Sequence, residues 1–93
     1  MRLNAQHILV AQEFEAKDIL RKLEEGTSFE ELARDYSLCS SASEGGNLGI
    51  FTKGQMVPAF EKALLELGPF QISDIVKTQF GFHIIRRLTT KSA

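Results

Sequence analysis

The sequence predicts an α+β domain with a four-stranded, largely antiparallel sheet and about three to four surrounding helices, in the order β-α-α-β-α-β-β. Apolar, β-branched segments stand near both ends of the chain. Stretches with the helical spacing of apolar residues lie between them, and the last segment reads as a strand-turn-strand hairpin. The chain has 93 residues, so we expect one domain, 1–93, with a single modest core.

The first predicted strand covers about Leu3–Val10, and its apolar residues do not strictly alternate, which indicates burial on both faces. A helix is predicted next, with i, i+3, i+4, i+7 spacing at Ala16, Ile19, Leu20 and Leu23, and with Gly26 placed to end it. Ser28 is placed to cap a second helix, with Glu31 completing a capping box.

The stretch "SLCSSASEGG" (37–46) is small and polar and is predicted to be a surface loop. A short strand (47–51), a turn and a third helix (57–69) follow, with Pro58 in its first turn and Gly68 as its stop. Strands at 71–77 and 82–88 are predicted to form a hairpin through "TQFG", and the tail 89–93 is expected to fray. The first and last strands are the most apolar, so we expect them side by side in the centre.

Composition excludes several classes of partner. The net charge is −1 and no stripe of Lys or Arg occurs, which argues against a nucleic-acid partner. No apolar run approaches the ~20 residues that span a bilayer, so no membrane partner is expected. The N-terminus lacks the pattern of a signal peptide, and the single cysteine, Cys39, fits a reducing compartment. We therefore expect a cytoplasmic monomer.

A histidine interrupts each of the two most apolar segments, His7 in "AQHILVA" and His83 in "GFHIIRRL". If these strands are neighbours, the two rings can face each other, and neutral imidazoles can satisfy each other as donor and acceptor in a dry core. Two ordinary core histidines remain the alternative. A zinc site with Cys39 and Asp35 is disfavoured, because no closely spaced pair of ligands is present.

Three blocks, "QHILV", "SLCSSASEGGNLGIFTKGQMVPAFEKAL" and "VKTQFGFHII", resemble in order and spacing the motifs of the parvulin family of peptidyl-prolyl cis/trans isomerases. The resemblance is strongest to the small single-domain bacterial parvulins and extends from about residue 4 to residue 88. It implies a parvulin/FKBP-like fold and rotation of X-Pro bonds in unfolded or flexible polypeptides. It also implies that no metal and no other cofactor takes part.

The resemblance assigns two groups of site residues. The first group is the paired histidines, the cysteine-or-aspartate position with the serine beside it, and a threonine that holds the histidine network: His7, His83, Cys39, Ser40 and Thr78. The second group is an apolar proline pocket, covered from the hairpin loop by its last member: Leu48, Met56, Phe60 and Phe80. Taken alone, Phe60 is also compatible with an ordinary core position, whereas Met56 stands in a turn before the third helix.

Three roles are open for Cys39: a buried structural thiol, a nucleophile activated by histidine, or a polar group facing the substrate carbonyl. We favour the third, because rotation about an amide needs no nucleophile. The connection "AQEFEAK" (11–17) carries Glu13 and Glu15 against Lys17, so a phosphate before proline is not expected to be favoured. The main alternative function is a non-catalytic polypeptide-binding or chaperone module that uses the same groove; a thiol hydrolase is a more distant one.

Overall fold

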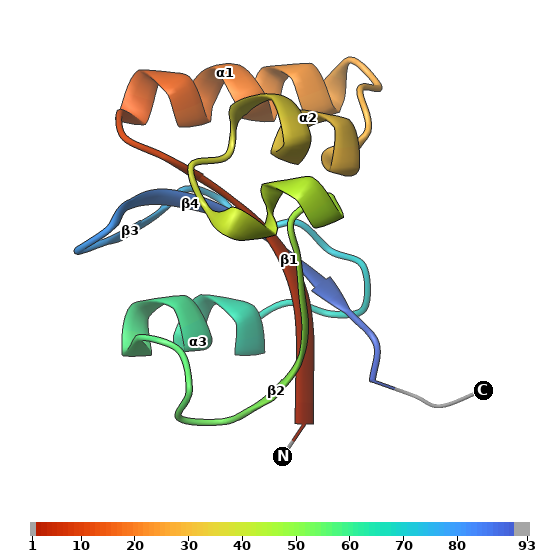
Figure 1. Ribbon diagram of the computed structural model, residues 1–93, viewed down its shortest axis with the longest axis vertical. Helices are drawn as coiled ribbons and strands as arrows, with labels where there is room; N and C mark the ends of the chain where they lie inside the picture. The colour runs from red at the N-terminus through yellow and green to blue at the C-terminus, as the bar shows by residue number, and fades with distance from the viewer. Residues whose placement is uncertain (1, 91–93) are drawn as a thin grey trace.

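The computed structural model describes residues 2–90. Within this range the chain forms four strands, three α-helices and one short 3-10 helix, η1 (Figure 1). Their bounds are β1 (Arg2–Val10), α1 (Glu13–Glu24), α2 (Phe29–Tyr36), η1 (Ser40–Glu44), β2 (Asn47–Thr52), α3 (Pro58–Leu65), β3 (Val76–Thr78) and β4 (Gly81–Leu88). The predicted fold class and element order are therefore confirmed.

The sheet has the strand order β2-β1-β4-β3, and all neighbouring strands are antiparallel. The first and last strands are therefore central neighbours, as their apolar composition predicts. In the register between them, His7 lies opposite Ile85 and Leu9 lies opposite His83. Side chains alternate between the faces of a strand, so His7, Leu9, His83 and Ile85 all belong to the same face of the sheet.

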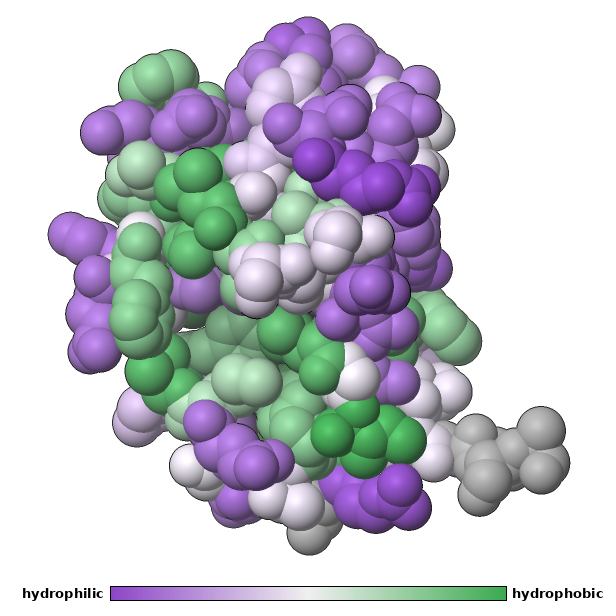
Figure 2. All heavy atoms as spheres, viewed as in Figure 1, coloured by the Kyte–Doolittle hydropathy of each residue, from purple (hydrophilic) through white to green (hydrophobic). Residues whose placement is uncertain are grey.

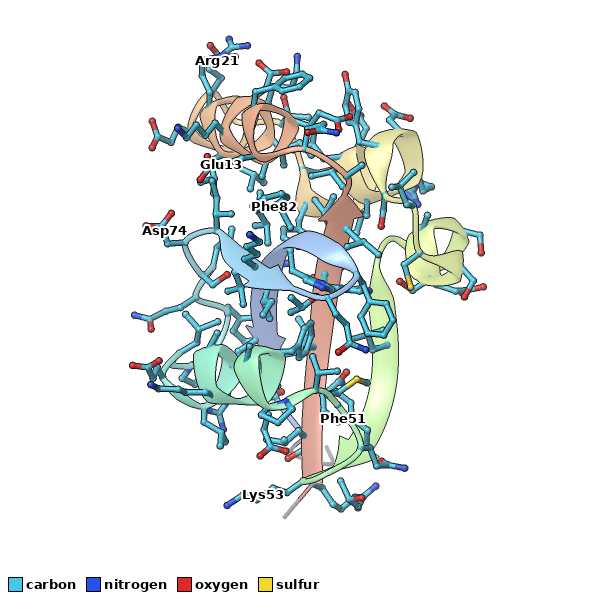
Figure 3. All side chains as sticks on the ribbon, turned by 90° about the vertical axis from the view of Figure 1, so that its left-hand side faces the viewer. Glu13, Arg21, Phe51, Lys53, Asp74 and Phe82 are labelled. Carbon is cyan, nitrogen blue, oxygen red and sulfur yellow. The ribbon has the colours of Figure 1, made fainter. Side chains whose placement is uncertain are left out.

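Each face of the sheet carries its own core, which differs from the single core expected from the chain length. Helices α1 and α2 cover one face and α3 covers the other (Figure 1). Ile8 and Val10 of β1 pack with α1 and α2, whereas Leu3 and Ala5 of the same strand pack with α3. Figure 3 shows the same division, with Phe82 toward α1 and Phe51 near α3. Burial of β1 on both faces is thus confirmed.

Capping residues in the sequence predict where helices α2 and α3 begin. Ser28 Oγ accepts the backbone N–H of Glu31 at 3.1 Å, which is the serine half of the predicted capping box. Pro58 is the first residue of α3, as expected. The same helix ends earlier than predicted, at Leu65, because the chain leaves it in a 3-10 turn in which Leu67 N–H donates to Leu64 O.

The loop predicted at 37–46 contains a helical turn that the sequence analysis missed. Ala42 N–H donates to Cys39 O and Gly45 N–H donates to Ala42 O, both at 3.0 Å, which is the spacing of a 3-10 helix. Small polar residues suit both a loop and such a turn, so composition alone does not separate the two.

The strand predicted at 71–77 is wrong over most of its length. Only Val76–Thr78 pairs continuously with β4, and Ile72 forms an isolated bridge to Arg86. Between these pairs, residues 73–75 stand opposite only two residues of β4, which makes a bulge. Ser73 Oγ accepts Ile85 N–H at 3.0 Å, so a side chain replaces the backbone bond that a regular strand would supply.

The two-residue turn between Thr78 and Gly81 confirms the predicted hairpin. The tail expected to fray lies mostly outside the described residues. No helix within residues 2–90 has the length and apolar character needed to cross a membrane.

Candidate functional site

The two strand histidines meet on the face of the sheet that α3 covers. His7 Nδ1 and His83 Nδ1 are 3.1 Å apart, and the two rings are stacked with centroids 5.3 Å apart. Only 6% of His7 and 4% of His83 is exposed, so each ring must find its polar partner inside the protein. The structure thus brings together the pair that the sequence predicts.

Thr78 extends this pair into a chain of hydrogen bonds. Its Oγ1 lies 2.7 Å from His83 Nε2 and accepts the backbone N–H of Phe80 at 3.2 Å. Two tautomer arrangements complete this chain. Either the threonine hydroxyl donates to His83 Nε2 and His83 Nδ1–H donates to His7 Nδ1, or His7 Nδ1–H donates to His83 Nδ1 and His83 Nε2–H donates to Thr78 Oγ1. In both arrangements His7 Nε2 is buried and has no hydrogen-bond partner among the described residues.

Both histidines are held in the neutral form at neutral pH. Burial, with a smaller contribution from neighbouring His83, lowers the pKa of His7 to about 4. Burial also lowers the pKa of His83 below its ordinary value. The site therefore presents two uncharged imidazoles to whatever it binds.

This burial predicts that the protein loses stability as the pH falls below 6.5. The unfolded chain takes up protons at both histidines in that range, whereas the folded protein does not until the pH is lower. We expect the free energy of unfolding to fall by ~2 kcal/mol between pH 7 and pH 5 from His7 alone. Urea titrations at both pH values measure this loss, and equal stability at the two pH values would contradict the buried, neutral pair.

An apolar hollow of about 380 Å³ opens beside the histidines. Ten residues line it: His7, Leu9, Cys39, Leu48, Gln55, Met56, Val57, Phe60, Phe80 and His83. None of these is a Lys, Arg, Asp or Glu. Figure 2 shows apolar surface gathered around this hollow, over α3 and on the connection that leads into η1. Every member of the predicted proline pocket is among the lining residues.

Phe60 lines the hollow and contacts both histidine rings. Its ring meets the rings of both His7 and His83 edge-on, with centroids 5.5 Å away in each case. It is also 3% exposed and packs in the core on the α3 face. Phe60 thus packs in the core and lines the hollow at the same time; that it contacts a bound proline stays a prediction.

The turn before α3 places Met56 in the lining of the hollow. Gln55 Oε1 accepts Thr52 N–H at 2.6 Å, and Glu61 Oε1 accepts Gly54 N–H at 2.7 Å. These side-chain bonds fix the turn from both ends, so that Met56 enters the hollow one turn before Phe60. Gln55, Val57 and Leu9 line the hollow without having been predicted; only their nearness to predicted residues in the sequence could have indicated them.

Cys39 lies at the rim of the hollow, directly before η1. It is half-buried and has no disulfide partner. Burial raises the pKa of its thiol, but the nearby hydroxyl and amide groups of Ser41 and Ser40 favour the thiolate, and the net pKa lies below the ordinary value. Ser40 does not line the hollow itself, and Ser41, which the sequence analysis did not single out, acts on the same sulfur.

Gly46 fastens the loop that carries Cys39 to the histidine strand. Its carbonyl accepts the backbone N–H of His7 at 2.9 Å. A Cβ atom at Gly46 would lie 2.5 Å from His7 O and 3.1 Å from Ala33 Cβ, and the residue has a φ of +85°. Only glycine fits both the close approach and the left-handed backbone.

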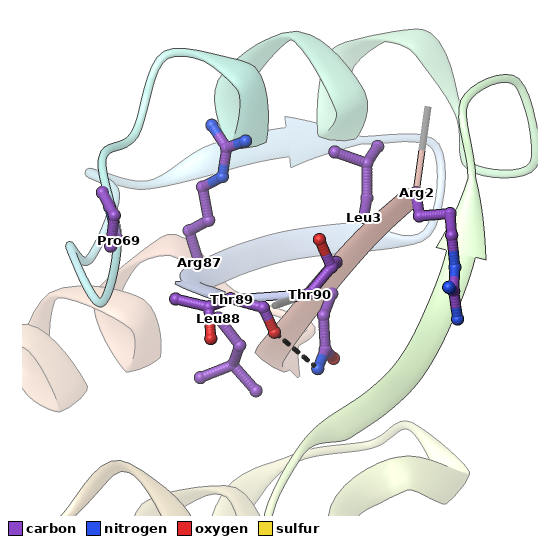
Figure 4. A pocket seen from close by; sticks show the side chains of 8 residues that line it. Arg2, Leu3, Pro69, Arg87, Leu88, Thr89 and Thr90 are labelled. Carbon is purple, nitrogen blue, oxygen red and sulfur yellow. Dashed lines mark hydrogen bonds between the residues drawn. The ribbon is translucent and has the colours of Figure 1, made fainter. Parts of the chain in front are cut away.

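A second cavity, also about 380 Å³, lies at the other end of β1 (Figure 4). It is lined by Arg2, Leu3, Arg87 and the residues around them, and Asn4 Nδ2 donates to Thr89 O across it. It contains neither histidine nor cysteine, so it lacks the chemistry of the first hollow. Among residues 2–90 no group of three or more His, Cys, Asp or Glu side chains is placed to hold a metal ion.

Known proteins share the sequence pattern of this chain. The profile of the rotamase family, described as PPIC-type PPIase domain, matches residues 7–89. The foldase protein PrsA of Bacillus subtilis is 49% identical over 87 residues, which is 92% of this chain and 30% of that protein. The chain thus spans about a third of the length of this curated relative.

Solved structures show the same fold. The crystal structure of peptidylprolyl isomerase (PrsA) from Bacillus anthracis superposes with a TM-score of 0.94 and 47% identity, over 98% of this chain and 42% of that one. The solution structure of NmPin, the parvulin of Nitrosopumilus maritimus, superposes with a TM-score of 0.84 and 44% identity, over 95% of this chain and 96% of that one. The resemblance seen in the sequence is therefore confirmed, and the chain belongs to the PPIC-type peptidyl-prolyl isomerase family, the parvulins.

Proposed function

We propose that this chain catalyses rotation about X-Pro peptide bonds in unfolded or flexible polypeptides. The observation that carries the proposal is the uncharged hollow beside Met56 and Phe60, with the hydrogen-bonded pair of His7 and His83 next to it. Proline is apolar and compact, so it can bind in such a hollow, where no charged side chain lies beside it. The foldase name of the relatives supports polypeptides as the substrates, since a slow X-Pro rotation can limit folding.

The chemistry requires no bond to break. Rotation is slow because amide resonance opposes it, with a barrier of ~18–20 kcal/mol. The planar amide is a strong dipole that water solvates well, whereas the twisted amide has lost much of this charge separation. A dry, apolar site therefore stabilises the twisted form relative to the planar one, which is preferential binding of the transition state. His7 and His83, being neutral, keep the site free of charge.

Cys39 is proposed to face the substrate carbonyl as a polar group and to form no covalent bond. Its replacement, Cys39→Ala, is expected to slow isomerisation only partly, on the order of tenfold, which corresponds to ~1.4 kcal/mol. The measurement is kcat/KM on a proline peptide, accompanied by intact-mass analysis of the wild type with substrate. Complete loss of activity together with a trapped thioester would overturn this assignment.

Phosphorylation before proline is not expected to improve a substrate. No Lys or Arg lines the hollow, and Glu13 and Glu15 begin α1 at the end of the histidine strand. A phosphate of nearly two negative charges would therefore find no cation among the residues that line the hollow, and the nearby start of α1 in the sequence carries carboxylates instead of a clamp of cations. We expect kcat/KM for phosphoserine-proline to be no higher than for alanine-proline in matched peptides. A gain of roughly tenfold or more, equivalent to ~1.4 kcal/mol of transition-state binding, would refute the expectation.

A protease-coupled assay tests the proposal directly. A protease that cleaves only the trans X-Pro form reports how fast the cis form converts, and this chain should accelerate that conversion in proportion to its concentration. The alternative, a non-catalytic polypeptide-binding module, predicts binding of the same peptide with an unchanged rate of conversion. Monomeric state and cytoplasmic location stay predictions from the sequence, and the foldase relatives give the location no support.

A further inference from the structure

The loop that carries Cys39 is hydrogen bonded to β1 at both of its ends. At its start, Leu9 N–H donates to Ser37 Oγ at 3.1 Å. At its end, His7 N–H donates to Gly46 O at 2.9 Å. Figure 1 shows this segment, between α2 and β2, running beside β1. The Cys39 loop and the histidine strand are therefore joined by hydrogen bonds, and both contribute to the lining of the hollow.

A third attachment of this loop comes from a side chain of β1. Gln6 directly precedes His7 and points to the opposite face of the sheet, the face to which Ile8 also belongs. Gln6 Nε2 donates to Gly45 O at 3.1 Å. Gln6 thus holds Gly45 through its side chain, while His7 holds the next loop residue, Gly46, through its backbone.

An ion pair fixes the Gln6 side chain in turn. Gln6 Nε2 also donates to Glu30 Oε2 at 2.9 Å, and Gln6 Oε1 accepts Arg86 Nη1 at 3.1 Å. Arg86 Nη1 and Glu30 Oε2 are 3.6 Å apart. Gln6 is only 4% exposed, and both polar atoms of its amide are hydrogen bonded within the protein. Two of its three bonds go to charged groups, which form stronger hydrogen bonds than neutral ones do.

The same cluster packs against the loop backbone. A Cβ atom at Gly45 would lie 2.9 Å from Glu30 Cγ, so the Glu30 side chain lies directly against this glycine. From there, hydrogen bonds of η1 lead back to the thiol residue, because Gly45 N–H donates to Ala42 O and Ala42 N–H donates to Cys39 O. A constraint at Gly45 therefore reaches Cys39 through one short helical turn.

A glutamine is an unusual choice at this buried position. Its neighbours on this face of β1, Ile8 and Val10, belong to an apolar core. A polar side chain loses its hydration when it is buried, and only hydrogen bonds within the protein offset that loss. The bonds of Gln6 connect β1 to the loop, to α2 and to β4, and an apolar side chain of the same size would leave these elements unconnected at this point.

We propose that Gln6 is a positioning residue for the isomerase site: with Glu30, it fixes the loop so that Cys39 keeps its place relative to His7 in the lining of the hollow. This inference rests on the proposed isomerase function. Gln6 does not line the hollow and acts only through the loop. A displacement of about 1 Å at a reacting centre is enough to slow a reaction substantially.

Gln6→Met tests the proposal, because methionine has a similar length but forms none of these hydrogen bonds. We expect kcat/KM per folded molecule to fall about fivefold, mainly in kcat, since Met56 and Phe60 are untouched. Glu30→Ala, at a partly exposed site, should cause a smaller loss in the same direction, and Glu30→Gln, which keeps an acceptor for Gln6, should cause none.

Ile19→Val is the matched control for a change in the core on this face. Ile19 is buried in the same core as Ile8 but makes no contact with the hydrogen bonds of Gln6. We expect its kcat/KM per folded molecule to stay within about twofold of the wild type. A fall as large as that of Gln6→Met would show that any loosening of this core slows the reaction.

A double-mutant cycle separates positioning from a general structural role. If Gln6 acts through Cys39, Gln6→Met should have little further effect on kcat/KM in a Cys39→Ala background, so the two changes are not additive. A fivefold fall in both backgrounds, or in neither, would overturn the proposal.

Hydrogen exchange of the His7 amide provides a readout that needs no activity. We expect Gln6→Met to speed this exchange about tenfold relative to the other amides of β1, because the bond to Gly46 O is loosened. Unchanged relative exchange would overturn the inference. Faster exchange, together with a wild type that does not accelerate X-Pro rotation, would support the attachment of the loop by Gln6 and overturn the isomerase function.

Discussion

Replacing Gly46 by alanine should destabilise the protein by about 3–5 kcal/mol, a large part of the total stability of a small domain. The new Cβ would lie 2.5 Å from the backbone oxygen of His7, and neither the central strand nor Ala33 on the other side has room to move away. The positive φ of the residue adds a further cost. Denaturant unfolding monitored by circular dichroism measures the loss.

Gly54→Ala is the control for the backbone part of this cost. Gly54 also has a positive φ, +97°, but a Cβ there would have no atom within 4 Å. We expect a loss of only ~1–2 kcal/mol from this change. Equal losses at Gly46 and Gly54 would show that the close approach of the Cys39 loop to the histidine strand is not a constraint.

Phe60→Ala should abolish most of the catalysis, by about 100-fold in kcat/KM, equivalent to ~2.7 kcal/mol of transition-state stabilisation. Phe60 walls the hollow and meets both histidine rings edge-on, so its removal widens the site and admits water beside the amide. The same change leaves a cavity in the core, at a cost of about 3–5 kcal/mol of stability. Activity must therefore be expressed per folded molecule.

Leu64→Ala separates the two effects. Leu64 is fully buried on the same helix and in the same core, but it does not line the hollow. It should cost a similar 2–5 kcal/mol of stability while leaving kcat/KM per folded molecule within about threefold of the wild type. If Leu64→Ala slowed isomerisation as much as Phe60→Ala, the hollow would have no specific part in catalysis.

The sequence predicted the fold best in the segments where burial determines which residues are apolar. β1 and β4 are apolar because both of their faces are covered, and this made their central position and the meeting of His7 with His83 predictable. The prediction failed at residues 71–75, which carry two isoleucines directly before the paired strand. There, the backbone N–H groups of Ile85 and Ile75 donate to the side chains of Ser73 and Asp74 and not to a regular strand ladder. Such competition depends on tertiary neighbours that a local pattern does not contain.

The residues of the candidate site were also predicted only in part. The resemblance to the parvulins named nine residues, and eight of them either line the hollow or hydrogen bond to a histidine that does; the exception is Ser40. The sequence did not predict three further lining residues, Leu9, Gln55 and Val57, because each is of a type that is ordinary in a strand or turn. Their part in the hollow follows only from where α3 ends and from how Gln55 folds back onto Thr52.

Magnetisation-exchange NMR on a proline peptide, with a catalytic amount of the chain, tests the central claim most directly. Exchange between the cis and trans signals takes tens to hundreds of seconds without a catalyst, too slow to give cross peaks. We predict cross peaks with the wild-type chain and much weaker ones with Met56→Ala, which removes part of the apolar lining of the hollow. No exchange with the folded wild type, or equal exchange with Met56→Ala, would contradict the claim that this dry hollow favours the twisted amide.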